Sequence, residues 1–465
     1  MTTTFPRSTP SALGIDARGI TAFLDTLEST PDVEPHGVVL LRHGRVAAQG
    51  WWAPYAADRV HLLYSLSKSF TAAAVGIAVR EGLVDLDATV LSYFPELDAD
   101  VTDDRSRRMR VRHLLAMASG HREETLQRAE ATDPEDLVRG FLLTPPDEEP
   151  GTVFAYNQPC TYTLAAIVRR TSGVTLVDYL RPRLLDPLGI HDLAWKRDDT
   201  GAELGFSGAY APTAAVAALG QLYLQRGVWD GARILDEDWV DAATSTQVEN
   251  PDEEDPDWRQ GYGFQFWMAR HGFRGDGAYG QFCVVLPEQD VVLALTGQSL
   301  DMQAVLDAAW QHLLPAIVPQ DGSTAQEGAA VVPDADAGLE ARLASLGLPP
   351  VSGGRLADGA AGSYESDGVL EGLRLEPDAE DWRLTVDVDG GLLSVPVGQG
   401  AWAVEGPLAA SAATGPDGTV QVVVRFVETP HAARLRLDPA TGTASGEWVT
   451  QPLHDGPLTL RRPTD

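Results

Sequence analysis

The chain has few cysteines, a deficit of basic residues and no long apolar run. Of its 465 residues only Cys160 and Cys283 are cysteines, which excludes a fold held by a disulfide framework. The 35 lysines and arginines face 67 aspartates and glutamates, and the net charge of -32 argues against nucleic acid or an anionic membrane as partner. No stretch has the roughly 18 apolar residues of a membrane span, and residues 1–7 contain no apolar signal segment. We therefore expect a soluble, cytoplasmic protein.

A metal-ligand pattern of histidines and cysteines is also missing. The acidic run at 252–257 has no such residues beside it, so we interpret it as a solvated loop. Cys160 and Cys283 are interpreted as buried small side chains, because a cysteine nucleophile would lack a clear histidine partner. His113 is interpreted as structural, whereas His121 could contact a substrate at a cleft rim. The sequence thus predicts neither a metal nor an organic cofactor.

Length and composition divide the chain into two domains. At roughly 150 residues per domain, a chain of 465 residues predicts two or three units. In residues 1–318, strand patterns near both ends enclose helical patterns, which favours an α/β (α+β) domain with one mixed sheet flanked by helices. Residues 319–352 are small and polar, as in a linker. Residues 353–465 alternate apolar and polar side chains between closely spaced turns, which predicts a small antiparallel β-barrel-like domain.

Ser65 and Lys68 precede an alanine-rich apolar stretch at 70–79. This stretch predicts a helix with Ser65 at its start and Lys68 one turn further on the same face. A serine becomes nucleophilic when a base takes its proton, and a lysine can be that base if burial or a nearby cation keeps it neutral. Amides at a helix start also favour the negative charge of acyl transfer. A capping serine beside a solvated lysine is the alternative.

A second candidate segment is Phe154-Ala155-Tyr156-Asn157-Gln158. A tyrosine beside a lysine could relay a proton to a leaving group, and an amide side chain could hold the lysine or the substrate carbonyl. The alternative is a loop tyrosine packed on the core.

The third candidate is the glycine-rich segment 274–281, which leads into the apolar strand pattern at 282–286. Glycines at a strand edge let a ligand approach the backbone, and an edge amide can face an oxyanion. A plain hairpin turn is the alternative. The aromatic residues that precede this segment could line an apolar acyl pocket, or pack in the core: Trp258, Tyr262 and Trp267.

In this order the three segments resemble the serine β-lactamase and penicillin-binding-protein-like superfamily, in particular its class C-like esterases, peptidases and amide hydrolases. The resemblance covers residues 13–315 and also includes residues 82–87, 94–96, 111–115, 119–120, 150–151 and 187–190. It implies a β-lactamase/transpeptidase-like fold with Ser65 as acylated nucleophile, Lys68 as its base and Tyr156 as proton relay. It also implies an oxyanion hole between the Ser65 amide and the strand after Gly280. The tail resembles the lipocalin-like β-domain often appended to such hydrolases.

The sequence departs from the family pattern at two places. The family usually has Tyr-x-Asn, whereas this chain has Tyr156-Asn157-Gln158, so that either amide could do the work of the asparagine. The family's third motif is Lys or His, any residue, then Gly; the match here is Gly275-Asp276-Gly277, which lacks the cation that grips a substrate carboxylate. Arg274 or His271 could substitute, but Asp276 has the opposite charge. The candidate oxyanion and substrate-binding residues are Asn157, Gln158, Arg274, Asp276, Gly277 and Gln281.

The function predicted from these features is a serine hydrolase that acts through an acyl-enzyme on a small-molecule or peptide-like ester or amide. Its substrate is expected to lack the carboxylate that the third motif's cation binds in β-lactamases and D-Ala-D-Ala peptidases. Three alternatives remain open: an acyltransferase or peptide cyclase, a β-lactamase or D-Ala-D-Ala-type peptidase, and a catalytically silent ligand-binding protein. The sequence fixes neither the substrate, nor the role of the tail, nor the oligomeric state.

Overall fold

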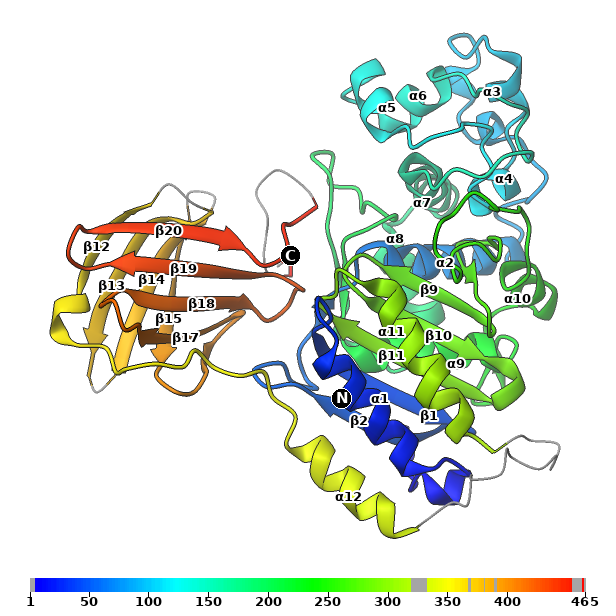
Figure 1. The fold of residues 1–465 in the computed structure, drawn as a ribbon. Coiled ribbons are helices and arrows are strands. Elements are labelled where there is room, and N and C mark those ends of the chain that lie inside the picture. Colours follow the sequence, from blue (N-terminus) through cyan, green and yellow to red (C-terminus); the bar gives the residue numbers. More distant parts are fainter. Residues whose placement is uncertain are drawn as a thin grey trace.

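The computed structural model describes residues 5–318, 333–366, 369–379, 381–388, 391–453 and 462–463. An α/β domain, blue to green in Figure 1, is followed by a separate β-barrel, drawn in yellow to red. Within the described ranges, every helix is too short or too polar to span a lipid bilayer.

A six-stranded sheet of order β2-β1-β11-β10-β9-β8 forms the centre of the first domain. Its strands are β1 (Pro35–Arg42), β2 (Arg45–Trp51), β8 (Trp267–Met268), β9 (Phe273–Gly277), β10 (Gln281–Leu286) and β11 (Val291–Gly297). As predicted, segments from both ends of the domain share one sheet, because β1 pairs with β11. Each of these pairings is antiparallel, which corrects the expectation of a sheet of mixed direction. Except between β1 and β11, short turns join the neighbouring strands, and a short turn can only reverse the chain.

Helices cover both faces of this sheet (Figure 1). The side chains of β1 are all buried, and they alternate between two apolar cores. One core includes α2 (Ser67–Arg80) and α9 (Thr213–Leu224), and the other includes α1 (Ala17–Ser29) and α11 (Met302–Ala308). Burial on both faces explains why these strands are continuous apolar runs in the sequence.

The rest of the first domain lies mainly between β2 and β8 in the sequence. Its helices are α3 (Asp104–Arg108), α4 (Val111–Leu115), α5 (Leu126–Thr132), α6 (Leu137–Leu143), α7 (Gln158–Ser172), α8 (Leu176–Leu180) and α10 (Glu237–Ala243). Its short strands are β3 (His61–Leu62), β4 (Ala194–Trp195), β5 (Ala209–Ala211), β6 (Val228–Trp229) and β7 (Ala232–Arg233). In Figure 1, α3 to α6 form a cap beyond α7, on the side of the molecule away from β1 and β2.

The second domain is a closed barrel of order β15-β14-β13-β12-β20-β19-β18-β17, in which β15 also pairs with β17. Its strands are β12 (Gly362–Ser366), β13 (Glu371–Asp378), β14 (Asp381–Val388), β15 (Gly391–Gly398), β16 (Ala403–Glu405), β17 (Leu408–Thr414), β18 (Val420–Phe426), β19 (Ala432–Asp438) and β20 (Thr443–Trp448). The predicted β-barrel is confirmed, although two of its pairings, β12–β20 and β15–β17, are parallel. Closure requires the ends of the meander to meet, and these pairings close the ring.

The predicted linker contains a helix, α12 (Pro333–Ala344), which packs against the first domain. Leu339 and Leu346 are buried in the core shared with α1, and Arg342 lies 2.5 Å from the Glu28 carboxylate. The backbone of Leu348 then donates to the carbonyl of Ala53 at 2.8 Å. This part of the segment is therefore docked rather than free, because its leucines recur at helical spacing and face apolar surface. The polar stretch at 320–328 lies outside the described residues.

Candidate active site

Ser65 lies in a 3₁₀ turn, Tyr64–Leu66, that runs directly into α2. Its side chain is partly exposed to a pocket, and its hydroxyl accepts a hydrogen bond from the Lys68 amine at 3.0 Å. The helix rise brings residues three apart onto one face, as the sequence predicted. A hydroxyl and an amine are thus held in contact at the edge of a cavity.

Lys68 is 1% exposed, and its amine donates hydrogen bonds to three neutral oxygens. Besides Ser65 it donates to Gln158 Oε1 at 2.6 Å and to the Phe206 carbonyl at 2.8 Å. Burial lowers the pKa of Lys68 to about 7, against the weaker opposing influence of the Asp276 and Glu124 charges. A lysine with this pKa is neutral in about half of the molecules near pH 7, so it can accept a proton.

Tyr156 lies next to this pair, with the Lys68 amine 4.6 Å from the centre of its ring. The ring is stacked on Trp267 at 5.2 Å, which fixes its orientation, and both residues line the same pocket as Ser65. Burial raises the pKa of the Tyr156 phenol, while a hydrogen bond involving Ser65 partly lowers it. Tyr156 therefore remains protonated near neutral pH and can act as a donor.

The two adjacent amides face different partners. Gln158 begins α7 and accepts from Lys68, whereas Asn157 is completely buried and accepts from the Thr125 amide at 3.0 Å and hydroxyl at 2.9 Å. Of the two candidates, Gln158 is therefore the amide that contacts the lysine. Asn157 holds the loop before α5.

β9 passes so close to the Ser65 turn that only glycine fits at two of its positions. A Cβ on Gly277 would lie 2.1 Å from the Leu63 carbonyl and 3.1 Å from the Ser65 amide nitrogen. A Cβ on Gly275 would lie 2.6 Å from the Ser69 hydroxyl. The next residue after β9, Ala278, lines the pocket together with Ser65.

The charged residues of the third segment form a buried ion pair. Arg274 is 0% exposed and donates through Nε to Asp276 at 3.0 Å, and through Nη1 to the carbonyls of Asp257 and Met268. Its guanidinium also stacks 4.2 Å above the Trp258 ring. Asp276, and not Arg274, lines the pocket beside Ser65. The exposed His271 packs against Trp310 instead, so neither candidate cation takes the place of the family's lysine.

Gln281 supports the turn between β9 and β10 from behind. Its amide donates to the carbonyls of Ala278 and Tyr279, both at 3.1 Å, and to that of Gly297 at 2.8 Å. The strand that follows Gly280 is thus one strand removed from the pocket, and the backbone nearest Ser65 belongs to Gly277 and Ala278. Ala278 was missed in the sequence because a backbone amide leaves no side-chain signal.

The Ser65 pocket has a volume of 690 Å³, and its wall is rich in carboxylates and indoles. A neighbouring pocket of 620 Å³ shares Tyr156 and Glu253 with it and extends toward Arg122. Its carboxylates and indoles belong to Asp32, Glu253, Asp255, Trp258, Trp267, Asp276 and Asp301. Most of the acidic run at 252–257 is exposed, as expected of a solvated loop, and its Glu253 and Asp255 also line the Ser65 pocket.

Two other residues of the sequence analysis lie elsewhere. Asp257 is 0% exposed and binds Arg270 at 2.7 Å, and also accepts from Gln303 and Trp310. His121 is buried between Ser119 and the Thr144 carbonyl, and it is not among the residues that line the two pockets. In the described part of the chain, no three metal-ligating side chains come together.

The chain is similar in sequence to a known family and to several characterised hydrolases. A family model described as Beta-lactamase matches residues 32–316. The chain is 28% identical over 279 residues to the 6-aminohexanoate-dimer hydrolase of Paenarthrobacter ureafaciens, covering 55% of this chain and 70% of that protein. It is 31% identical over 185 residues to the lovastatin esterase of Penicillium rubens, covering 34% of this chain and 46% of that protein.

The fold recurs in solved structures with little sequence identity. The crystal structure of SurE with D-Leu superposes with a TM-score of 0.51 at 19% identity, and covers 90% of this chain and 97% of that one. Because the coverage exceeds the first domain, the likeness includes the barrel.

Proposed function

This chain belongs to the β-lactamase family and is a serine hydrolase, and from that premise we propose that it cleaves small-molecule or peptide-like esters or amides that carry no carboxylate beside the scissile bond. The observation that carries the proposal is the pairing of Ser65 with a lysine whose amine lies 3.0 Å away and whose pKa is lowered to about 7.

Acylation begins with Ser65. Its hydroxyl proton passes to the neutral Lys68 amine while Oγ bonds to the substrate carbonyl carbon. The backbone amides of Ser65 and Ala278 donate hydrogen bonds to the developing oxyanion, and preorganised donors of this kind contribute about 10²- to 10³-fold in rate. The bond to the leaving group then breaks, and the proton taken from Ser65 reaches that group through Tyr156.

Deacylation repeats these steps with water. The neutral Lys68 amine takes a proton from water as its oxygen attacks the carbonyl carbon of the acyl-enzyme ester, and the proton returns to Ser65 as the acyl group leaves as an acid. Gln158 holds the lysine amine in place throughout, through the 2.6 Å hydrogen bond that it accepts.

The charge of the pocket supports the restriction on substrates. Asp276 faces the cavity from the third motif, and four other carboxylates line the same wall. A substrate carboxylate would meet like charges there, which costs affinity and rate. This arrangement disfavours β-lactams and D-Ala-D-Ala peptides, and favours neutral acyl groups that pack on Trp258 and Trp267.

The test is covalent labelling of the wild-type protein and of Ser65→Ala with a fluorophosphonate, followed by intact mass. We expect one adduct on wild type, none on the variant, and turnover of p-nitrophenyl butyrate by wild type alone. The monoester p-nitrophenyl succinate, matched in length but anionic, should be cleaved at least about tenfold more slowly. An unlabelled wild-type protein, or a preference for the succinate, would contradict the proposal. Addition of an amine or alcohol acceptor separates hydrolysis from acyl transfer.

A further inference from the structure

The barrel reaches the active site through two short segments. Residues 427–431 join β18 to β19, and residues 449–453 follow β20. The first segment is anchored to the α/β domain by backbone, because the Glu428 carbonyl accepts from the Leu62 amide at 2.8 Å, and Val427 is buried in the core shared with β1. Leu62 lies three residues before the nucleophile.

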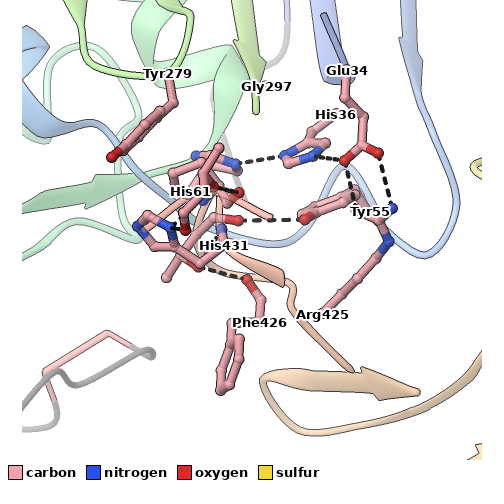
Figure 2. A network of polar contacts seen from close by, with 12 residues as sticks. Glu34, His36, Tyr55, His61, Tyr279, Gly297, Arg425, Phe426 and His431 are labelled. Atoms are coloured by element: carbon pink, nitrogen blue, oxygen red, sulfur yellow. Dashed lines mark hydrogen bonds and ion pairs between the residues drawn. The ribbon is translucent and has the colours of Figure 1, made fainter. Parts of the chain in front are cut away.

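A buried ion pair and two histidines secure this contact, as Figure 2 shows. Arg425 of the barrel donates to both oxygens of Glu34, at 2.6 and 2.9 Å. Glu34 also lies 3.1 Å from His36 Nε2, and His36 Nδ1 lies 3.0 Å from His61 Nε2. Pairing a charge with directional hydrogen bonds fixes one register between the domains.

The barrel also holds the residue before the nucleophile. His431 is fully buried, and its Nε2 lies 2.6 Å from the Tyr64 hydroxyl. Since His431 Nδ1 lies 2.9 Å from the Thr450 carbonyl, which only accepts, the proton resides on Nδ1. Burial lowers the pKa of His431 to about 4, so the ring is neutral and Nε2 accepts from the tyrosine. Tyr64 thus donates across the domain boundary.

Tyr279 makes the equivalent contact on the other side of the proposed oxyanion hole. It directly follows Ala278, and its hydroxyl donates to the Gln451 carbonyl of the barrel. Its ring packs edge-on against Tyr64, with centroids 5.5 Å apart, and against His431 at 5.4 Å. Both tyrosines have left-handed backbones, with φ of 46° at Tyr64 and 66° at Tyr279. A bulky residue keeps this conformation only where its surroundings impose it.

From these contacts we propose that the barrel is required for full activity because it positions active-site residues, and that His431 is a positioning residue for the nucleophile. By holding Tyr64 and Tyr279 in left-handed conformations, the barrel fixes the amides of the adjacent Ser65 and Ala278, the two donors to the oxyanion. This inference rests on the proposed function, because it assigns those two amides to the acylation step.

The test compares variants of the full chain that differ in one contact. Tyr64→Phe and His431→Leu remove the hydrogen bond from either side, and His431→Gln keeps an acceptor near the Nε2 position. Tyr55→Phe is the matched control, since the Tyr55 hydroxyl contacts the same barrel segment, at the Thr429 carbonyl, without adjoining the nucleophile. Kinetics with p-nitrophenyl butyrate are expressed per active site, counted by fluorophosphonate adduct, so that misfolded protein does not enter the rate.

We expect Tyr64→Phe and His431→Leu to lose about ten- to a hundredfold in kcat with little change in KM, the effect of a misplaced donor. His431→Gln should recover most of that loss, and Tyr55→Phe should match wild type within about twofold. The double variant Tyr64→Phe/His431→Leu should be no slower than the worse single variant, because each substitution removes the same hydrogen bond between Tyr64 and His431.

Labelled Tyr64→Phe protein with wild-type kcat would overturn the inference, and so would a Tyr55→Phe variant that loses as much. If His431→Leu gives too little folded protein, the isosteric Tyr64→Phe still decides. A wild-type protein without adduct contradicts the proposed function itself, whereas labelled variants of undiminished rate contradict only the role of the barrel.

Discussion

Two buried cations, Lys68 and Arg274, lie on neighbouring elements beside the same pocket, and they differ in what they contact. Lys68 donates to a hydroxyl, an amide oxygen and a carbonyl, all neutral. Arg274 donates to the Asp276 carboxylate as well as to two carbonyls. Burial lowers the pKa of both side chains, and it lowers that of Lys68 to about 7.

A buried amine becomes a base when its partners do not compensate for the desolvation of its charge. Neutral oxygens orient the Lys68 amine but do not compensate for the desolvation of its charge, so the amine binds its proton weakly. The Asp276 carboxylate offsets part of that cost for Arg274, and a guanidinium stays protonated in proteins in any case. Substitutions that change the partners of Lys68 or of Arg274 therefore test this difference.

Removal of the lysine should have the largest effect. Lys68→Met replaces the amine by an apolar chain of similar length, so that Ser65 loses the base 3.0 Å from its hydroxyl. We expect kcat/KM for p-nitrophenyl butyrate to fall by about 10³-fold or more. Lys196→Met, at the only other lysine in the sequence, is the control and should retain activity. A loss of less than tenfold in Lys68→Met would assign the base to another residue.

Removal of the carboxylate partner should mainly cost stability. Asp276→Asn leaves the Arg274 guanidinium buried without its carboxylate, and breaking a buried pair from one side costs about 3–5 kcal/mol. Denaturant unfolding should therefore show a much lower midpoint. Glu96→Gln, which breaks the exposed pair of Glu96 and Arg170, should leave the midpoint nearly unchanged. If the two variants shift the unfolding midpoint equally, the burial of Arg274 does not increase the cost of losing its carboxylate partner.

These two cations also show how far the sequence alone reaches. The contact between Ser65 and Lys68 could be predicted because local spacing sets which residues share a helix face, and Tyr156 was assigned beside them because the order of three short segments resembles a family. The barrel was found from alternation of apolar and polar residues. Neither pattern shows whether an arginine two residues from an aspartate faces the pocket or the core.

Other features depend on contacts between distant residues. The sequence could not choose between Asn157 and Gln158, since one step along a starting helix turns the side chain to a different partner. The hydrogen bond from Tyr64 to His431 joins residues 367 positions apart, and the Glu34–Arg425 pair joins residues 391 apart. Periodicity reports only local structure, so these long-range pairs carry no signal in one sequence. The leucines of α12 did have helical spacing, but the small and polar residues around them favoured a linker.

The pH dependence of wild-type acylation should report the lowered pKa of Lys68. Only the neutral amine can accept the Ser65 proton, so kcat/KM should be half-maximal near pH 7 and fall about tenfold per unit below it. Between pH 7 and pH 5 the loss should reach about fiftyfold. Stopped-flow release of nitrophenol over pH 5 to 9 measures this profile, with circular dichroism at each pH to exclude unfolding. A rate that is flat across that range would contradict a lysine base.

The subtlest change makes the surroundings of the lysine resemble those of the arginine. Gln158→Glu places a carboxylate where an amide oxygen now lies 2.6 Å from the Lys68 amine. An adjacent opposite charge favours the protonated amine, so its pKa should rise by about one to three units. The midpoint of the pH profile should move up by the same amount, and the rate at pH 7 should fall at least about fivefold, while the rate at high pH stays near wild type. Glu124→Gln is the reverse control: the Glu124 charge raises the Lys68 pKa, so its removal should move the midpoint down. If Gln158→Glu shifts nothing, the neutral partners of Lys68 are not what makes it a base, and the contrast with Arg274 must have another cause.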